Sequence, residues 1–251
     1  HPNPLVGAVI VKNGRIIGEG WHEKYGELHA ERNALRSCIE NPEGAEMYVT
    51  LEPCCHYGKT PPCSEAIIKS GIKKLIVGSA DPNPKVSGGG VRAVRNAGIE
   101  VRESFLKDEC DELNRIFFHY ISKDTPYIIS KYAMSADGKI STVSGKSKWI
   151  SGEKSREDVQ KLRHRCMGIM TGIATVEADD PMLNCRLENG RNPVRIICDS
   201  SLKIRTDSRI VKSANEYETI IATAFEGLAD GEITESSTEG KIKELIQKKV
   251  K

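Results

Sequence analysis

The alternation of strand-like and helix-like segments limits the folds open to this chain more than any other feature. Short apolar runs predict strands, and apolar residues spaced three or four positions apart predict helices. From residue 45 onward, strand-like runs alternate with helical patterns along the chain, at 45–51, 61–71, 72–80, 91–98 and 99–103. Because parallel strands are joined by crossover helices, the sequence predicts a mainly parallel sheet covered on both faces.

The segment before residue 45 adds a hairpin and a first helix. Residues 5–22, LVGAVIVKNGRIIGEGWH, have the pattern of two strands joined by an Asn13-Gly14 turn, which is a strong hairpin signal. Residues 29–40, HAERNALRSCIE, have helical spacing. The first half of the chain is therefore expected to be an α/β domain.

A second α/β unit is expected after the first. The helical pattern of 106–126 leads out of the first unit, and a new apolar run follows it, so we place the domains at 1–123 and 124–251. Further strands are predicted at 127–133, 166–171, 193–199 and 217–223, with a helix at 152–164. The chain starts directly before a strand and stops in a charged helical stretch. We therefore expect a fragment of a longer protein.

The composition argues against several classes of protein. Lys and Arg total 37 against 35 Asp and Glu, so no overall charge favours nucleic acid or a membrane surface. We find no run of about 18 apolar residues and no pattern of a secretion signal. Eight cysteines scattered over a chain of 251 residues fit a reducing cytoplasm, where clustered cysteines more often bind metal. We expect a cytoplasmic protein without nucleic-acid or membrane partners.

The cluster PCCHYGKTPPC at 53–63 is the most informative motif, and three interpretations of it are open. A disulfide would join Cys54 or Cys55 to Cys63. A structural zinc site would take Cys55 or His56 as its fourth ligand. A catalytic zinc site would need only three protein ligands, because its fourth position is kept for water.

The segment HAE at 29–31 favours the catalytic site. His29 completes a ligand set with Cys54 and Cys63, and the dipole of the helix that begins near Cys63 favours a thiolate there. Residues two apart on a regular helix point to nearly opposite sides, so we expect His29 at the helix start, where it and Glu31 can face one site. Glu31 would then act as general base and acid, taking a proton from water and delivering it to a leaving amine.

These motifs resemble the zinc cytidine deaminase superfamily, whose signature is H-x-E followed by P-C and a second cysteine. Eight residues rather than two separate Cys54 from Cys63, and the segments PNPLVGAVIV, GWHEKYGELHAE, VTLEPCCHYGKTPPC and DPNP are similar to one branch, the bifunctional deaminase-reductases of riboflavin biosynthesis. The resemblance implies an N-terminal cytidine-deaminase-like three-layer αβα domain. A dihydrofolate-reductase-like α/β domain, incomplete at its C-terminus, would follow. The family usually has serine where Cys55 stands, so Cys55 is expected to be a bystander.

The resemblance also implies a substrate. It implies zinc-dependent hydrolytic deamination of 2,5-diamino-6-(5-phosphoribosylamino)pyrimidin-4(3H)-one, with ammonia as the leaving group. From the residues alone, His56 and Lys59 on a short loop suit an anionic group such as phosphate. The family's substrate-binding positions correspond here to Asn3, His22, His56, Lys59, Asp81 and Asn83.

The second half has no G-x-G-x-x-G, so a Rossmann-type site has no support. SKYAMSADGKISTVSGKSKWIS and MTGIATVEADDPMLNCR instead resemble the family's NADPH-dependent reductase domain, which reduces the ribosyl group of the deaminated product to ribityl. The resemblance implies NADPH contacts at Ala133, Trp149, Thr175, Asp179 and Ser200. It implies sugar-phosphate contacts at Ser147, Arg163, Leu183 and Arg186. The family's later acidic residue and glycine-rich segment do not occur before Lys251, which leaves the activity of this reductase half open.

Two other functions share part of this pattern. A deaminase of bases in RNA would have the same zinc core, but the near-neutral charge and 5% aromatic content argue against an RNA-binding surface. A non-catalytic, zinc-stabilised binding module would share the ligands without needing Glu31. Members of the family associate through the reductase domain, so the resemblance also implies a homo-oligomer.

Overall fold

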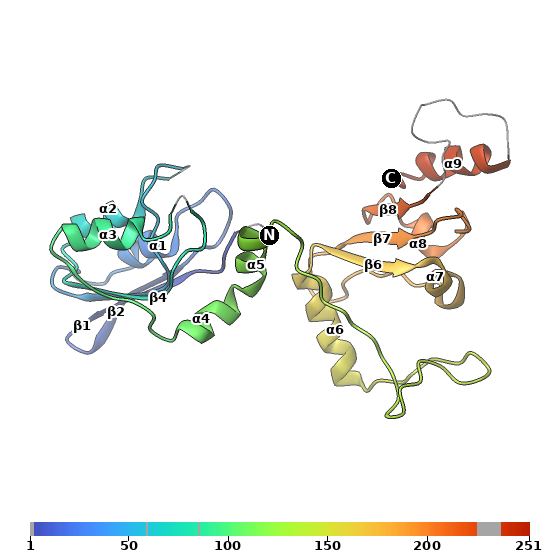
Figure 1. Cartoon of the computed structure of the whole chain (residues 1–251), viewed down its shortest axis with the longest axis horizontal. Coiled ribbons are helices and arrows are strands. Elements are labelled where there is room, and N and C mark those ends of the chain that lie inside the picture. The colour runs from blue at the N-terminus through green and yellow to red at the C-terminus, as the bar shows by residue number, and fades with distance from the viewer. Residues whose placement is uncertain (1–2, 59, 85, 225–236) are drawn as a thin grey trace. The chain divides into compact units, whose positions relative to one another are not determined.

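The computed structural model describes residues 3–58, 60–84, 86–224 and 237–251 (Figure 1). The chain divides into two compact units, residues 1–130 and 131–251, and each contains a sheet of its own. The division predicted near residue 123 falls at the end of helix α5 (Arg115–Lys123), a few residues before the division between these units.

The first unit is built on a five-stranded sheet in the order β2-β1-β3-β4-β5. Strands β1 (Gly7–Lys12) and β2 (Arg15–Trp21) form the predicted antiparallel hairpin. Asn13 and Gly14 between them have φ angles of 51° and 73°, the left-handed conformation that a tight two-residue hairpin turn requires.

The rest of this sheet is parallel, as the alternation predicts. Strands β3 (Glu46–Leu51), β4 (Lys74–Ser79) and β5 (Glu100–Arg102) run parallel to one another, and β3 also pairs antiparallel with β1. The helices that connect these strands lie on one face of the sheet (Figure 1). They are α1 (Ala30–Arg36), α2 (Cys63–Lys69) and α3 (Gly89–Asn96).

The core of the first unit lies between these helices and one face of the sheet. Alternate strand residues such as Ile10, Met47 and Leu75 are fully buried there. Each such side chain contributes about 1.5–3 kcal/mol through burial. On the opposite face, α4 (Lys107–Leu113) approaches β4 closely, because an added Cβ on Gly78 would lie 2.4 Å from the sulfur of Cys110.

The long helix predicted over 106–126 is interrupted. Asn114 leaves helical geometry, with φ −113° and ψ 16°, and separates α4 from α5. Its buried side chain accepts a hydrogen bond from the backbone N–H of Leu5 at 2.7 Å and donates one to the Leu5 carbonyl at 2.8 Å. This long-range contact holds the backbone at Leu5 in place. The helical pattern of 106–126 gives no sign of it, so the break at Asn114 could not be predicted from that pattern.

The strand predicted over 127–133 is wrong, because the structure assigns no strand there. The apolar side chains Ile128 and Tyr132 are 82% and 66% exposed. A strand needs a neighbour to take up its backbone hydrogen bonds. Among the described residues, neither sheet includes this segment.

The second unit contains a three-stranded parallel sheet in the order β6-β7-β8. Its strands match three of the predicted ones, and helix α6 matches the helix predicted at 152–164. Its elements are α6 (Glu153–Arg165), β6 (Gly168–Gly172), α7 (Ile173–Asp179), β7 (Val194–Cys198), α8 (Arg209–Lys212), β8 (Thr219–Ala222) and α9 (Ser237–Gln247). Ile197, Ile204 and Ile210 are the fully buried centre of its core. Within the described part of the chain, every helix is too short or too polar to span a lipid bilayer.

Candidate metal centre and active site

The start of helix α1 carries the first group of the site. His29 is the N-cap residue and has an extended backbone, with φ −76° and ψ 164°. It therefore stands at the helix start, where the sequence analysis expected it so that His29 and Glu31 can face one site. The helix lies directly on β2, because an added Cβ on Gly20 would come within 2.3 Å of the Ala34 nitrogen. The two backbones can approach this closely only with glycine at this position.

Three side chains meet at this point. The Nδ1 atom of His29 lies 3.6 Å from the sulfur of Cys54 and 3.4 Å from the sulfur of Cys63. Cys54 follows β3, and Cys63 is the first residue of α2. The three candidate ligand atoms all lie within 4.8 Å of one another. An imidazole and two thiols at this separation fit the donor set and spacing of a zinc site.

The thiols of this site are free, so the disulfide interpretation is wrong. The Cys63 thiol donates a hydrogen bond to Cys54, and this bond lowers the pKa of the Cys54 thiol to about 4. The same bond and burial raise the pKa of Cys63, so the pair shares one proton. The hydrogen bond between His29 and Cys54 raises the pKa of the His29 imidazole above its ordinary value of 6.5. This cluster therefore holds protons that a cation would displace.

Glu31 lies beside the cluster and is only 3% exposed. Burial is the main cause that raises the pKa of its carboxyl, and the nearby Cys54 thiolate adds to it. Glu31 is not among the three residues whose ligand atoms meet. A buried carboxyl with a raised pKa, next to a metal site but outside its ligand set, is suited to proton transfer.

The structure brings two of the predicted substrate-binding residues against the cluster. Asn3 Nδ2 lies 2.8 Å from His22 Nε2, and the His22 ring meets the His29 ring edge-on at 5.3 Å. The other ring nitrogen of His22 lies 3.1 Å from the carbonyl oxygen of Leu28. A carbonyl only accepts, so Nδ1 of His22 carries the proton and Nε2 accepts from Asn3.

Two more of the predicted residues lie on the loop after β4. Asp81 is buried and accepts a hydrogen bond from the backbone N–H of Asn83 at 2.8 Å. Burial raises the pKa of the Asp81 carboxyl, and the hydrogen bond from Asn83 opposes that shift. His56 itself is exposed, and Lys59 lies outside the described residues.

Cys55 is not part of the three-residue group. Its sulfur lies under the turn that leads into α3, 3.9 Å from the Val86 carbonyl oxygen and 2.5 Å from where a Cβ on Gly89 would lie. Neither Cys55 nor His56 joins the cluster as a fourth ligand within the described part of the chain, which argues against a closed structural zinc site.

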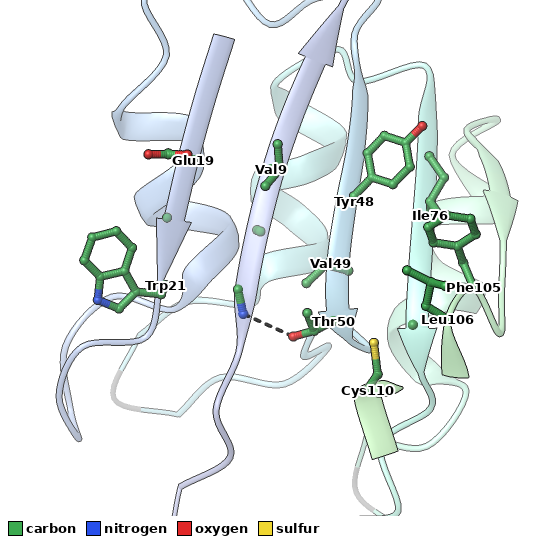
Figure 2. A pocket seen from close by; sticks show the side chains of 14 residues that line it. Val9, Glu19, Trp21, Tyr48, Val49, Thr50, Ile76, Phe105, Leu106 and Cys110 are labelled. Carbon is green, nitrogen blue, oxygen red and sulfur yellow. Dashed lines mark hydrogen bonds between the residues drawn. The ribbon is translucent and has the colours of Figure 1, made fainter. Parts of the chain in front are cut away.

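One cavity lies on the other face of the sheet. It has a volume of about 420 Å³ and is lined by side chains such as Val9, Tyr48 and Ile76 (Figure 2). These residues alternate with the core residues that face α1 to α3, so they point away from them. The cavity therefore does not include the His29, Cys54 and Cys63 cluster.

In the second unit, the predicted sugar-phosphate residues are partly brought together. Arg163 of α6 donates to the carbonyl oxygen of Asn184 at 2.9 Å, and burial and the charge of Arg186 both lower its pKa. Its Nε has no partner among the described residues. Two neighbouring guanidinium groups with a spare donor suit an anion. Leu183, three positions before Arg186, is buried and has a φ of 52°. Ser147 is half-buried in an irregular segment.

The predicted NADPH residues are distributed over several elements. Thr175 and Asp179 lie on α7, and Ser200 follows the end of β7. Ala133 and Trp149 lie in the irregular segment before α6. The Trp149 ring is 71% exposed, and the guanidinium of Arg156 stacks 4.5 Å from its centre. The structure does not gather these residues around one described cavity.

Glu52 and Arg195 are among the buried charged residues that the sequence patterns did not indicate. Glu52 is 4% exposed and precedes Pro53 and Cys54 directly. Arg195 is fully buried in the middle of the second unit. For Arg195 the signal in the sequence is a charge within an apolar strand pattern, whereas Glu52 follows the strand that ends at Leu51 and no pattern indicates its burial.

Comparison with known proteins assigns each unit to a class. Residues 1–79 match the family described as the cytidine and deoxycytidylate deaminase zinc-binding region, and residues 126–240 match the RibD C-terminal domain. The fold and the ligand cluster thus define a zinc-binding, deaminase-like domain joined to a RibD reductase-like domain.

Similarity to whole proteins narrows this class to one family. The chain is 43% identical to a deaminase/reductase of known structure from Thermotoga maritima, with a TM-score of 0.84, over 98% of this chain and 72% of that one. It is 58% identical to the riboflavin biosynthesis protein RibD of Actinobacillus pleuropneumoniae and 48% identical to that of Aquifex aeolicus. The chain belongs to the RibD family. These matches cover 91% and 90% of the chain, which spans 61% and 64% of the length of these two relatives.

Proposed function

We propose that the first unit is a zinc-dependent hydrolase that removes the 2-amino group of 2,5-diamino-6-(5-phosphoribosylamino)pyrimidin-4(3H)-one. The observation that carries this proposal is the meeting of His29, Cys54 and Cys63 beside the buried carboxyl of Glu31. The Thermotoga maritima protein is described as a diaminohydroxyphosphoribosylaminopyrimidine deaminase, which supports the choice of substrate.

The residues divide the chemistry among them. His29, Cys54 and Cys63 would hold Zn²⁺, which when bound lowers the pKa of a water molecule towards neutrality and so supplies the nucleophile. Glu31 receives the proton of that water on its carboxylate and returns it to the departing amino group, so that ammonia can leave. Because Glu31 is buried, bulk water does not compete for this proton.

The surrounding side chains bind the pyrimidine nucleotide. Asn3 and His22 hold each other in a fixed orientation beside His29, and an amide with a fixed orientation can read the polar edge of a base. Asp81 and Asn83 present polar groups from the loop after β4. We assign the substrate phosphate to the loop of His56 and Lys59, where cationic side chains suit an anion.

The second unit supplies the reductase half of the same pathway. We propose that it binds NADPH through Ala133, Trp149, Thr175, Asp179 and Ser200. Hydride transfer from this cofactor would reduce the ribosyl group of the deaminated product to ribityl. The neighbouring cations Arg163 and Arg186, with Ser147 and Leu183, would bind the sugar phosphate.

Location and assembly belong to the same proposal. None of the eight cysteines forms a disulfide, which supports a reducing compartment such as the cytoplasm. We propose a homo-oligomer formed through the second unit, with small molecules rather than nucleic acid as binding partners. Light scattering of the purified protein would measure the assembly.

The test of the deaminase is ammonia release from the pyrimidine nucleotide. We expect turnover by the purified protein, loss of turnover after treatment with a zinc chelator, and recovery when Zn²⁺ is restored. A chelator-insensitive rate would exclude the metal-dependent mechanism. Release of ammonia from an RNA base but not from the nucleotide would favour the RNA deaminase, and zinc binding without any turnover would favour the binding module.

The test of the reductase is separate. The protein for this test is one as long as the RibD relatives. We expect the fluorescence of NADPH to change when NADPH is titrated with that protein. Absence of binding in that longer protein would exclude the reductase assignment.

A further inference from the structure

A buried carboxylate links the loop of the zinc ligand Cys54 to the loop of the predicted substrate-binding residues. Glu52 is 4% exposed and stands at the end of β3, two positions before Cys54. Its own backbone N–H donates to the carbonyl of Ser79, at the end of β4, at 2.9 Å. The side chain therefore starts between the ends of two parallel strands, where the loops that form such sites begin.

The Glu52 carboxylate accepts hydrogen bonds from four backbone N–H groups. One oxygen accepts from Gly88 at 3.0 Å and from Asp81 at 3.4 Å. The other accepts from Gly90 at 3.1 Å and from Val91 at 3.3 Å, in the first turn of α3. No ion pair of Glu52 occurs within the described ranges of the chain, so these amides and the positive end of the α3 dipole are what stabilise its charge.

A second contact holds the same two loops together. An added Cβ on Gly90 would lie 1.8 Å from the carbonyl oxygen of Pro53, so the first turn of α3 rests on the backbone beside Cys54. Gly88 has a φ of 70°, which turns the chain into the helix. The bonds to Glu52 span both ends of the loop 81–88, which carries Asp81 and Asn83.

We propose that Glu52 is a positioning residue for the deaminase: it anchors the described residues of the loop 81–88 (81–84 and 86–88) at a fixed place relative to Cys54, and so aligns the pyrimidine base with the reacting centre. This inference rests on the proposed deaminase function and names no new catalytic group. Glu52 acts through the loop, because its four hydrogen bonds all go to backbone N–H groups of this loop and of α3. Loss of the anchor should weaken substrate binding more than it slows the chemical step.

The test is Glu52→Gln in the whole chain, with Glu46→Gln as the matched control at the other end of β3. Glutamine keeps the shape but replaces one acceptor oxygen by an NH₂ group that faces backbone donors. We expect KM for the pyrimidine nucleotide to rise about tenfold, equivalent to about 1.4 kcal/mol, while kcat falls by less than about threefold. Zinc content should stay at the wild-type value, and the control should behave as wild type.

Amide hydrogen exchange gives a readout that does not need turnover. In Glu52→Gln we expect faster exchange at Asp81, Gly88, Gly90 and Val91, with unchanged exchange in β3 and β4. Unchanged exchange at these four amides, wild-type KM, or loss of zinc would each overturn the proposal. If Glu52→Gln does not fold, Glu52→Asp, which keeps the charge but is one methylene shorter, is judged by the same readouts. A wild-type protein that releases no ammonia would remove the proposed function, and the exchange data would still decide whether Glu52 anchors the loop.

Discussion

The Nδ1 atom of His29 lies 3.4 Å from the sulfur of Cys63, although 34 positions separate the two residues in the sequence. His29 begins α1 and Cys63 begins α2, so the starts of two helices meet at one point. A metal ion bound there would tie both helices to the end of β3 through Cys54, and so connect the site to the stability of the whole first unit.

Removal of zinc should therefore destabilise the first unit. An ion present at 100 to 1,000 times its dissociation constant stabilises the folded state by about 2.7–4.1 kcal/mol. When a chelator is added, we expect the free energy of unfolding of this unit to fall by that amount and its transition to move to lower temperature, as measured by calorimetry. A His29→Ala variant should show no such response, and a chelator effect of equal size in that variant would contradict the assigned ligand set.

Glu31→Gln should abolish deamination without removing the metal. Glutamine has nearly the same shape but cannot take up the proton, so we expect kcat to fall about 10²–10⁴-fold while zinc content stays unchanged. Steady-state ammonia release and elemental analysis measure the two quantities. The exposed Glu27→Gln serves as control and should retain wild-type kcat. Wild-type turnover in Glu31→Gln would show that another group carries the proton.

Zinc binding should release protons and become weaker in acid. The pKa of Cys54 is lowered to about 4, so this thiol is already ionised at pH 7. The pKa of Cys63 is raised, so its thiol holds a proton that zinc must displace, and the raised pKa of His29 adds a fraction of a second, which gives about one to two protons per ion near neutral pH. The apparent affinity should fall as pH falls through the range in which His29 gains its proton. Titration calorimetry in buffers of different ionisation enthalpy gives the number, and a value of zero would contradict this protonation scheme.

Gly20→Ala should separate α1 from β2. Its Cβ would lie 2.3 Å from the Ala34 nitrogen, so the helix that carries His29 must move, at a cost of about 1–3 kcal/mol. Gly7→Ala on the neighbouring strand is the control, because nothing lies within 4 Å of its added Cβ, and we expect it to stay within about 0.5 kcal/mol of wild type. Urea denaturation compares the two. Equal stability would show that α1 does not depend on this close approach.

Arg195→Met should strongly destabilise the second unit. The buried guanidinium donates to the carbonyls of Met182, Ile210 and Tyr217 and to the hydroxyls of Ser213 and Thr219. Burial lowers its pKa to about 10, so it is charged at pH 7. Methionine would leave these acceptors unpaired, and we expect a loss of about 3 kcal/mol or more in denaturant unfolding.

Arg191→Ala is the matched control for this variant. Arg191 also donates to three carbonyls, those of His164, Arg165 and Cys166, but it is only half-buried. Water can replace its bonds, so we expect a loss below about 1 kcal/mol. If the two variants are equally destabilised, burial is not what makes Arg195 important.

The local patterns of the sequence were sufficient for the α/β architecture and for the metal cluster. The Asn13-Gly14 hairpin and the parallel strands of the first unit are confirmed, because they depend on turn chemistry and on hydrophobic period. His29, Cys54 and Cys63 could be named because thiols and imidazoles in this order are rare except at metal sites. The resemblance to the riboflavin deaminase-reductases is confirmed by the family matches of both units.

Other features arise only from contacts between distant segments. The break at Asn114 depends on hydrogen bonds to Leu5, and the predicted strand at 127–133 finds no neighbour in either described sheet. The roles of Glu52 and Arg195 follow from backbone groups that the folded chain places around them. The periodicity of a sequence shows which face of a helix or strand is apolar. A buried charge is instead stabilised by hydrogen-bond donors or acceptors from several elements, and the chain brings these groups together only when it folds.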